Sequence, residues 1–320
     1  MICMKPLISL IIPISPRENI DIFLRNLKKT KYPNKLEIIF AEGKNPSKQR
    51  NEAIKKSRGD IIYFLDSDSY PQKDIFQFLL KDFKKNIDGV GGPAINPESS
   101  SLIQKTFHSV LSSFLGSGMM RYRYKPKKGE GKENDFILCN FGLRKNVAKK
   151  FMLEGKLFNE NLHPNEENEL FSRLFEAKRK IIYDPNLIVF HEPRKTLLGF
   201  SKQIFNYGRG RMRHFIIRPK SFNPYFFMPT AFLLYLILTP FLYNFFGFVS
   251  ILPLISYIIL VLYYAFLFSF KNFNPLYIFS VPLSYFILHI SYGMGLLYGI
   301  FSERKLSQEP IKVKKICMKK

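Results

Sequence analysis

The feature that most constrains this chain is a long stretch with almost no charge. Between residues 229 and 301 the only formally charged side chain is Lys271. The buried core of a soluble protein rarely supplies so long an uncharged stretch. Segments 229–249, 250–270 and 276–301 are each long enough to cross a hydrocarbon core of roughly 30 Å. We therefore expect a membrane region of about three apolar helices.

The rest of the chain is strongly basic. Over the whole chain, 49 Lys and Arg residues outnumber 25 Asp and Glu residues, which gives a formal net charge of +24. Such a molecule is attracted to anions, including phosphates, anionic lipid headgroups and nucleic acid. The charge narrows the class of partner without choosing among these.

The cysteines and the first residues indicate a reducing compartment and no leader. Cys3, Cys139 and Cys317 are far apart and show neither zinc-site spacing nor a disulfide framework. The apolar run at 7–12 is short, is followed by Pro13 and has no small-residue cleavage site after it. We interpret this run as a buried strand rather than a signal peptide.

The first seventy residues alternate between two patterns. Apolar runs of strand length at 7–12, 36–40 and 61–65 are separated by segments 18–29 and 48–56, which have helical periodicity. This alternation predicts an α/β fold whose strands are parallel. Ligands of such sheets bind outside the carboxyl ends of the strands.

The following segments are predicted more coarsely. They are a helix near 72–85, an amphipathic stretch at 102–115, a basic loop at 121–132, a strand pair within 136–143, a helix at 165–177, an extended segment at 181–191 that is broken by Asp184-Pro185, and an interrupted basic helix at 195–218 of the kind that lies on a membrane surface.

Two carboxylates follow the third predicted strand. Asp66 and Asp68 flank Ser67 in a tight turn, where they could hold a hard cation and, through it, a diphosphate. A turn that merely closes the strand is the alternative explanation of the same three residues.

The N-terminal motifs resemble a known family. The segments IIPISPREN, IIFAEG and SKQRNEAIKKSRGDIIYFLDSD are similar in order and spacing to the nucleotide-binding half of the family 2 GT-A glycosyltransferases. The resemblance implies a GT-A, Rossmann-like α/β domain that binds a nucleotide-sugar and a divalent metal, Mn²⁺ or Mg²⁺. It places in the donor and metal sites Pro13, Glu42, Arg50, Asn51, Asp60, Asp66 and Asp68.

The resemblance continues through FNENLHPNEENELFSRLFEAKRKIIYDPNLIVFHEPRKTL. Glu166, Glu167 and Glu169 fall on the EDxEL motif of the family, which makes Glu167 the general base of a one-step, inverting displacement. Glu stands there in place of the usual Asp. An acidic first helical turn that favours the helix dipole is the alternative for these residues. His191 is implied as a metal neighbour, and a purely structural histidine is its alternative.

Segment 203–213, QIFNYGRGRMR, is similar to the QxxxYGRxR segment of membrane-bound family 2 enzymes that extend lipid-linked or exported polysaccharides. It places Gln203, Tyr207, Arg209 and Arg211 on the acceptor or membrane side, together with Glu166 and Glu169. A basic cluster that binds lipid headgroups is the alternative for the arginines. With SSFLGSGMMRYRY at 112–124, the resemblance is to the succinoglycan-biosynthesis-type transferases.

We therefore expect an inverting glycosyltransferase that acts on a lipid-linked or polysaccharide acceptor, has membrane lipids as neighbours and does not bind nucleic acid. A polyprenyl-phosphate sugar synthase is the alternative enzyme, and assays with polyprenyl phosphate and with a polyprenyl-diphosphate-sugar would separate the two. A non-catalytic basic membrane protein is a third possibility. The expected domains are a catalytic domain at 1–195, a basic juxtamembrane segment at 196–228, the apolar region at 229–301 and a basic tail at 302–320.

Two charge signals conflict over topology. The basic residues that precede the apolar region keep the catalytic domain in the cytosol under the positive-inside rule. Three crossings would then export the basic tail, which the same rule disfavours. Either one apolar segment, most plausibly 229–249 with Pro240, is interfacial or re-entrant, or the tail is exported against its charge.

Overall fold

The computed structural model describes residues 7–32, 36–302 and 310–318. The chain divides into two compact units: a sheet unit, made of Met1–Pro97, Met119–Glu192 and Arg304–Lys320, and a helical unit, made of Glu98–Gly118 and Pro193–Glu303. Cys3 and, within the basic tail, residues 303–309 and 319–320 lie outside the described part.

The first three strands form the parallel centre of the main sheet. Strands β1 (Ile8–Ile14), β2 (Leu36–Glu42) and β3 (Ile61–Phe64) are joined by helices α1 (Asp21–Lys28) and α2 (Pro46–Lys56). Strand β1 pairs in parallel with β2 on one side and with β3 on the other. The parallel arrangement predicted from the alternating pattern is confirmed.

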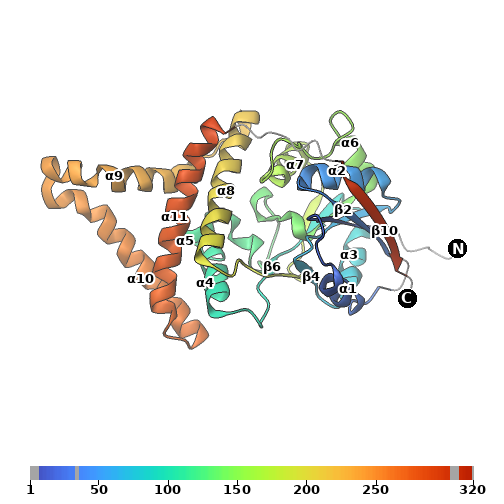
Figure 1. Cartoon of the computed structure of the whole chain (residues 1–320), viewed down its shortest axis with the longest axis horizontal. Helices are drawn as coiled ribbons and strands as arrows, with labels where there is room; N and C mark the ends of the chain where they lie inside the picture. The colour runs from blue at the N-terminus through green and yellow to red at the C-terminus, as the bar shows by residue number, and fades with distance from the viewer. Residues whose placement is uncertain (1–6, 33–35, 303–309, 319–320) are drawn as a thin grey trace. The chain divides into compact units, whose positions relative to one another are not determined.

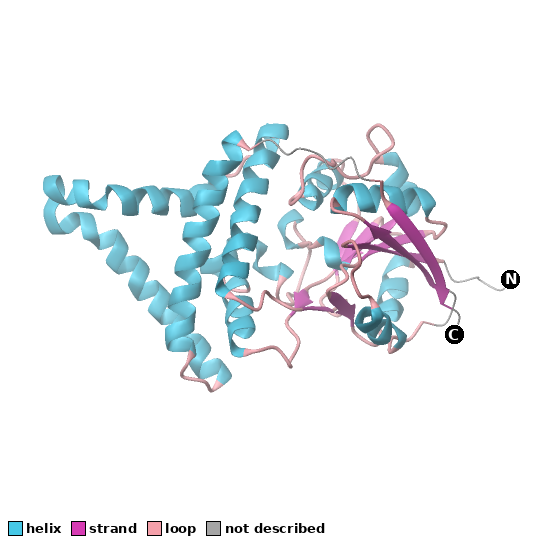
Figure 2. Cartoon of the chain, in the orientation of Figure 1, coloured by secondary structure: helices cyan, strands magenta, loops and turns pink. Residues whose placement is uncertain are grey.

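The complete sheet is mixed rather than wholly parallel. Its order is β10-β2-β1-β3-β7-β5-β8, and the strands are magenta in Figure 2. Strand β7 (Phe141–Arg144) runs antiparallel to β3 and to β5 (Gly89–Gly91), and β5 is parallel to β8 (Ile181–Tyr183). The outer strand β10 (Lys312–Met318) pairs antiparallel with β2.

Both faces of the sheet are covered, which explains why its strands are continuous apolar runs. Leu10 and Ile12 pack with α1 and α3 (Ile75–Phe83) on one face. Ile11 packs on the other face with α2, α6 (Lys145–Lys150) and α7 (Glu166–Glu176). All three isoleucine and leucine side chains are fully buried.

A second, three-stranded sheet contains β4 (Ser69–Pro71), β9 (Val189–His191) and β6 (Ala94–Ile95), in the order β4-β9-β6. Strand β4 is antiparallel to β9, and β6 is parallel to it. This small sheet joins the turn after β3 to a segment more than one hundred residues later in the chain.

One sequence prediction about strands was wrong. Segment 136–143 contains one strand, β7, preceded by the short 3-10 helices η2 (Glu133–Asp135) and η3 (Leu138–Asn140). The side chain of Asn140 fixes this bend, because its amide donates to the carbonyl oxygens of Pro93 and Leu187. The extended segment 181–191 is broken after Tyr183, as the prediction of a break at Asp184-Pro185 required, and its two strands, β8 and β9, belong to different sheets.

The helical unit contains α4 (Leu102–Leu111), α5 (Phe114–Ser117), α8 (Leu197–Ile217), α9 (Met228–Phe246), α10 (Leu252–Asn272) and α11 (Tyr277–Phe301). Short 3-10 helices connect them: η1 (Gly118–Arg123) follows α5, η4 (Pro219–Ser221) and η5 (Pro224–Phe227) lie between α8 and α9, and η6 (Gly247–Ile251) joins α9 to α10. Two helical stretches, Pro224–Asn272 and Tyr277–Phe301, are long and apolar enough to cross a membrane.

Helix α8 is continuous, whereas the sequence predicted interruptions in it. Gly208 permits close packing on α11, since a Cβ atom at this position would lie 2.2 Å from the carbonyl oxygen of Tyr292. Tertiary contact thus compensates for the low helix propensity of glycine.

Strand β10 should contribute measurably to stability. Ile316 packs against the core of the sheet, while its neighbour Lys314 is exposed. We expect Ile316→Ser to lower the free energy of unfolding by about 1.5 kcal/mol, because apolar surface is lost from the core. Lys314→Ser is the matched control and should change little. Thermal unfolding of the full chain in detergent measures both, and equal effects would contradict the packing of β10.

Candidate functional site

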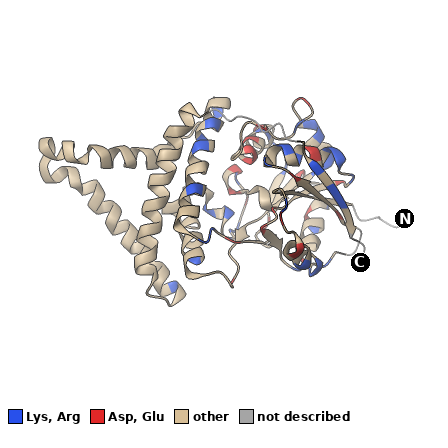
Figure 3. Cartoon of the chain, viewed as in Figure 1, with Lys and Arg blue, Asp and Glu red and all other residues tan. Residues whose placement is uncertain are grey.

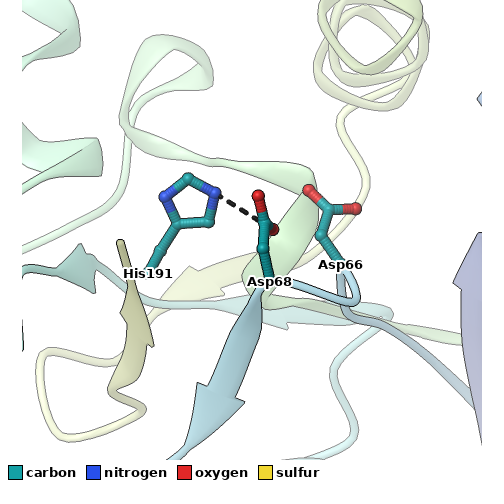
Figure 4. A group of neighbouring side chains, drawn as sticks. All are labelled: Asp66, Asp68 and His191. Carbon is teal, nitrogen blue, oxygen red and sulfur yellow. Dashed lines mark ion pairs between the residues drawn. The ribbon is translucent and has the colours of Figure 1, made fainter. Parts of the chain in front are cut away.

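Strand pairing brings together Asp66, Asp68 and His191. The first two follow β3, and Asp68 directly precedes β4, whose Ser69 lies opposite His191 in the antiparallel pair with β9. The Nε2 atom of His191 is therefore 3.3 Å from Oδ1 of Asp68, the contact drawn as a dashed line in Figure 4. One ligand atom from each of the three residues lies within 4.8 Å of the others.

This group has the composition and access of a divalent cation site. Its side chains remain partly exposed, at 33% for Asp66, 49% for Asp68 and 24% for His191. Carboxylate oxygens suit Mg²⁺ and Mn²⁺, and imidazole nitrogen suits transition metals. The three residues could hold such an ion.

The guanidinium of Arg50 joins this group to helix α7. Arg50 lies on α2 and is 5% exposed. Its Nη2 atom donates to Oδ1 of Asp66 and its Nη1 atom donates to Oε1 of Glu166, each at 2.7 Å. Burial lowers the pKa of Arg50, but the carboxylates of Asp66 and Glu166 raise it above its ordinary value. Arg50 is therefore a fixed cation between two carboxylates.

Glu166 is a structural anion. His163 Nδ1 lies 3.0 Å from each of its carboxylate oxygens, opposite Arg50. Burial alone would raise the pKa of Glu166, but His163 and Arg50 lower it to about 2. A carboxylate held in this way is a poor proton acceptor near neutral pH.

Glu167 differs from its neighbours. Its side chain is 20% exposed, and its Oε1 atom lies 3.6 Å from Nη1 of Arg123 and 3.4 Å from the amide nitrogen of Asn168. Burial raises the pKa of Glu167, and the adjacent charge of Glu166 raises it further, while Arg123 opposes both. A reachable carboxylate with a raised pKa is suited to accept a proton.

Glu169 is bound to an arginine. Nε and Nη2 of Arg173 donate to its two oxygens at 2.8 and 2.9 Å. The bidentate geometry is typical of a strong, fixed ion pair. Among the three acidic residues in the first turn of α7, Glu167 is the one without such a short contact to an arginine.

Of the remaining residues predicted for the donor site, some lie at the carboxyl edge of the sheet and others do not. Pro13 and Glu42 lie near the carboxyl ends of β1 and β2, at the edge of the sheet where Asp66 follows β3. Asp60 lies at the opposite, amino end of β3, where it accepts a hydrogen bond from the backbone of Leu7. The amide of Asn51 holds the loop at residues 157–160 through four hydrogen bonds. The structure does not bring Asp60 and Asn51 into the cluster.

The predicted acceptor-side residues of segment 203–213 all lie on α8 in the helical unit. The amide of Gln203 donates to the hydroxyl of Tyr207 at 2.8 Å, one helical turn later. Arg209 is half-buried, and Arg211 is buried with its guanidinium carbon 4.2 Å from the centre of the Phe226 ring.

Sequence reasoning missed His163, Arg123 and Asn168. His163 stands three residues before Glu166, where its spacing from the acidic turn was the available signal. Arg123 lay unremarked within a basic loop, yet it is 4% exposed and donates to Asn168 Oδ1 at 2.6 Å. Together they fix the positions of Glu166 and Glu167.

The chain is similar to known glycosyltransferases. Residues 15–152 match the family described as Glycosyl transferase family 2. A dolichyl N-acetyl-alpha-D-glucosaminyl phosphate 3-beta-D-2,3-diacetamido-2,3-dideoxy-beta-D-glucuronosyltransferase of Methanococcus voltae is 24% identical over 295 residues, covering 89% of this chain and 85% of the relative.

Solved structures of similar proteins include the mannosyltransferase PcManGT of Pyrobaculum calidifontis in complex with GDP-Man and Mn²⁺, at a TM-score of 0.48 and 14% identity over 69% of this chain and 66% of that one. They also include S. aureus TarS, at a TM-score of 0.42 and 15% identity over 65% of this chain and 43% of that one. The chain thus spans less than two thirds of either structure.

An α/β sheet with acidic residues at its carboxyl edge, followed by long apolar helices, agrees with the GT-A-like fold that the sequence predicted. The similarity to Glycosyl transferase family 2 over residues 15–152 indicates a glycosyltransferase.

The buried anion at Glu166 should be important for stability. We expect Glu166→Gln to lower the free energy of unfolding by about 3 kcal/mol at neutral pH, because Arg50 loses one of its two carboxylate partners. The pKa of Glu166 is lowered in the folded chain. Its stabilisation is therefore complete above the ordinary glutamate pKa and is lost as pH falls toward about 2.

Unfolding of wild type and variant between neutral and acidic pH measures this difference. The gap between the two should narrow as pH falls. A gap that stayed constant with pH would contradict the ionised state of Glu166. Glu154→Gln, at an exposed turn of the same unit, is the control and should match wild type throughout.

Proposed function

We propose that the chain is an inverting glycosyltransferase that moves a sugar from a nucleotide-sugar donor to a lipid-linked acceptor at the cytosolic face of a membrane. One observation carries this proposal. Arg50 links Asp66, a member of the candidate cation-binding group, to the first turn of α7, where the side chain of Glu167 is partly exposed. A donor diphosphate and an acceptor hydroxyl need these two kinds of group close together.

On the donor side, the residues at the carboxyl edge of the sheet would bind the nucleotide-sugar, with Pro13 and Glu42 facing the nucleotide. Asp66, Asp68 and His191 would hold Mn²⁺ or Mg²⁺, which when bound supplies positive charge to the departing nucleoside diphosphate. Arg50 fixes Asp66 through its 2.7 Å hydrogen bond and thereby orients one ligand of that site.

On the acceptor side, Glu167 would take the proton of the attacking hydroxyl. That oxygen forms a bond to the anomeric carbon as the bond to the diphosphate breaks, so the configuration inverts. The raised pKa of Glu167 makes it a better acceptor of this proton than an ordinary glutamate would be. Arg123 limits the rise and holds the carboxylate in place.

A lipid-linked acceptor is supported by the relative from Methanococcus voltae, whose name describes a dolichyl-linked sugar phosphate and whose alignment covers 89% of this chain. Gln203 and Tyr207 on α8 would meet this acceptor, while Arg209 and Arg211 would meet its phosphate or the headgroups of membrane lipids. The cytosolic location follows from the donor, since nucleotide-sugars are cytosolic, and from the arginines before the apolar region.

The metal site is tested by Asp68→Asn, which removes a ligand charge without disturbing Arg50. We expect turnover of the donor to fall by roughly 100-fold or more, because the diphosphate loses compensating charge. The matched control is Asp60→Asn at the opposite end of β3, which should retain most activity. Chelation by EDTA should abolish turnover, and Mn²⁺ or Mg²⁺ should restore it. Turnover that persisted in chelator would contradict a metal-assisted reaction.

The base is tested by Glu167→Gln. The variant should bind the donor normally but lose at least about 100-fold in kcat, because only the proton acceptor is removed. Glu169→Gln is the control and should be milder. In wild type, kcat should fall as pH drops through the raised pKa of Glu167, since the protonated form is inactive. The residual activity of the variant should lack this limb, and a stronger effect at Glu169 would assign the base to that residue instead.

A further inference from the structure

The apolar helices differ in how much protein surrounds them. In the stretch Pro224–Asn272, which contains α9 and α10, 11% of the most apolar part is buried within the protein. In α11 the corresponding share is 50%. Figure 3 shows α9 and α10 without charged residues except near the end of α10, where the charged residue is Lys271. Most of the surface of α9 and α10 therefore lacks a protein partner, whereas half of α11 has one.

The first half of α11 is bound to the segment Glu98–Gly118. This segment leaves the sheet unit and returns to it, so both of its ends are on the side of the sheet unit. Its helix α4 carries Lys105 and is too short to cross a bilayer, at about 15 Å for ten residues. Three hydrogen bonds join it and α5 to α11: Thr106 to Ser280, Tyr285 to Ser113, and His289 to the carbonyl of Leu115.

The second half of α11 is packed against α8, and Figure 1 shows the two helices side by side. Ser201 and Ser291 are hydrogen-bonded at 2.9 Å, and Arg213 donates to the carbonyl of Ser302 at the far end. A Cβ atom at Gly295 would lie 2.0 Å from the carbonyl oxygen of Phe205, so the two backbones are in close contact.

Helix α8 is a poor candidate for the hydrocarbon region. Its cationic side chains are Lys202, Arg209, Arg211 and Arg213. Each would cost about 2.5 to 3.5 kcal/mol at the centre of a bilayer. Because α11 is in contact with α8 over half of its length, α11 is held with α8 outside the hydrocarbon.

The chain after α11 returns to the sheet unit. Strand β10 pairs with β2 over seven residues, from Lys312 opposite Glu42 to Met318 opposite Leu36. Lys315 also lies 3.5 Å from the buried carboxylate of Glu37 on β2. The segments before α9 and after α11 are therefore on one side of the membrane, which excludes three crossings.

We propose that α9 and α10 alone enter the bilayer, as a hairpin that leaves the side of the sheet unit and returns to it, and that α11 stays on that side. Its legs of 19 and 21 residues are about 28 and 31 Å long, which matches a hydrocarbon core of roughly 30 Å. The turn at η6 exposes Phe246, Phe248 and Val249. Lys271 then lies at the returning end of α10, next to the polar boundary.

This arrangement removes the conflict between the two charge signals. The basic residues of α8 and those of β10 are on the same side, in agreement with the positive-inside rule. It also differs from the sequence expectation that segment 229–249 does not cross the membrane, because in this arrangement α11 is the apolar helix that stays outside the bilayer. The identification of this side as the cytosol rests on the proposed function. The inference that both segments are on one side of the membrane does not depend on it.

Single cysteines in a chain without other cysteines test the proposal in intact cells. The three positions are native Cys317 on β10, Phe273→Cys in the turn between α10 and α11, where the side chain is 96% exposed, and Lys149→Cys at an exposed position of the sheet unit. We expect an impermeant maleimide to label all three only after the cells are permeabilised.

Other patterns have distinct meanings. Labelling of Cys317 alone in intact cells would indicate three crossings, and labelling of Phe273→Cys alone would indicate that α10 and α11 cross while α9 does not; either overturns the proposal. Labelling of all three would support the shared side but contradict a cytosolic catalytic unit. The chain should also remain in the membrane after an alkaline wash, since release would mean that protein, such as a second copy, covers the hairpin.

Discussion

The buried guanidinium of Arg50 is the interaction on which the site depends. It lies between a carboxylate of the β3 turn and a carboxylate of α7, and neither partner is close to Arg50 in sequence. A buried ion pair adds little net stability, because desolvation of the charges offsets most of their attraction. The ion pairs of Arg50 matter here for position. They hold the candidate cation-binding group at Asp66 at a fixed distance from the helix turn that carries the candidate base Glu167.

The same network divides three similar side chains into three roles. Glu166 is fixed by Arg50 and His163, Glu169 is fixed by Arg173, and Glu167 keeps partial exposure with a raised pKa. The difference arises from the helix, which turns successive residues toward different surroundings. Chemical identity within EENE therefore does not decide function; the direction of each side chain does.

Local patterns predicted the parts of the fold that local physics controls. The runs at β1 to β3 are apolar because both faces of the sheet are covered, and the resemblance seen in the sequence agrees with the family match over residues 15–152. What the sequence could not predict depends on distant contacts. The bend before β7 depends on the amide of Asn140, and the continuity of α8 on its contact with α11. The role of Arg123 could not be recognised, because nothing in the neighbouring sequence indicates that this arginine of a basic loop is buried.

Strand β10 also has a consequence for the order of events during synthesis. The ribosome makes β2 well before β10, and the hydrophobic hairpin emerges between them. Until then the backbone groups along one edge of β2 have no strand beside them, and such an edge is a template for pairing with other chains. In the proposed topology, completion of the sheet awaits the insertion of α9 and α10 into the membrane. A chain that stalled at the proposed hairpin would present an open, aggregation-prone edge, so this topology would tie maturation of the sheet to successful insertion.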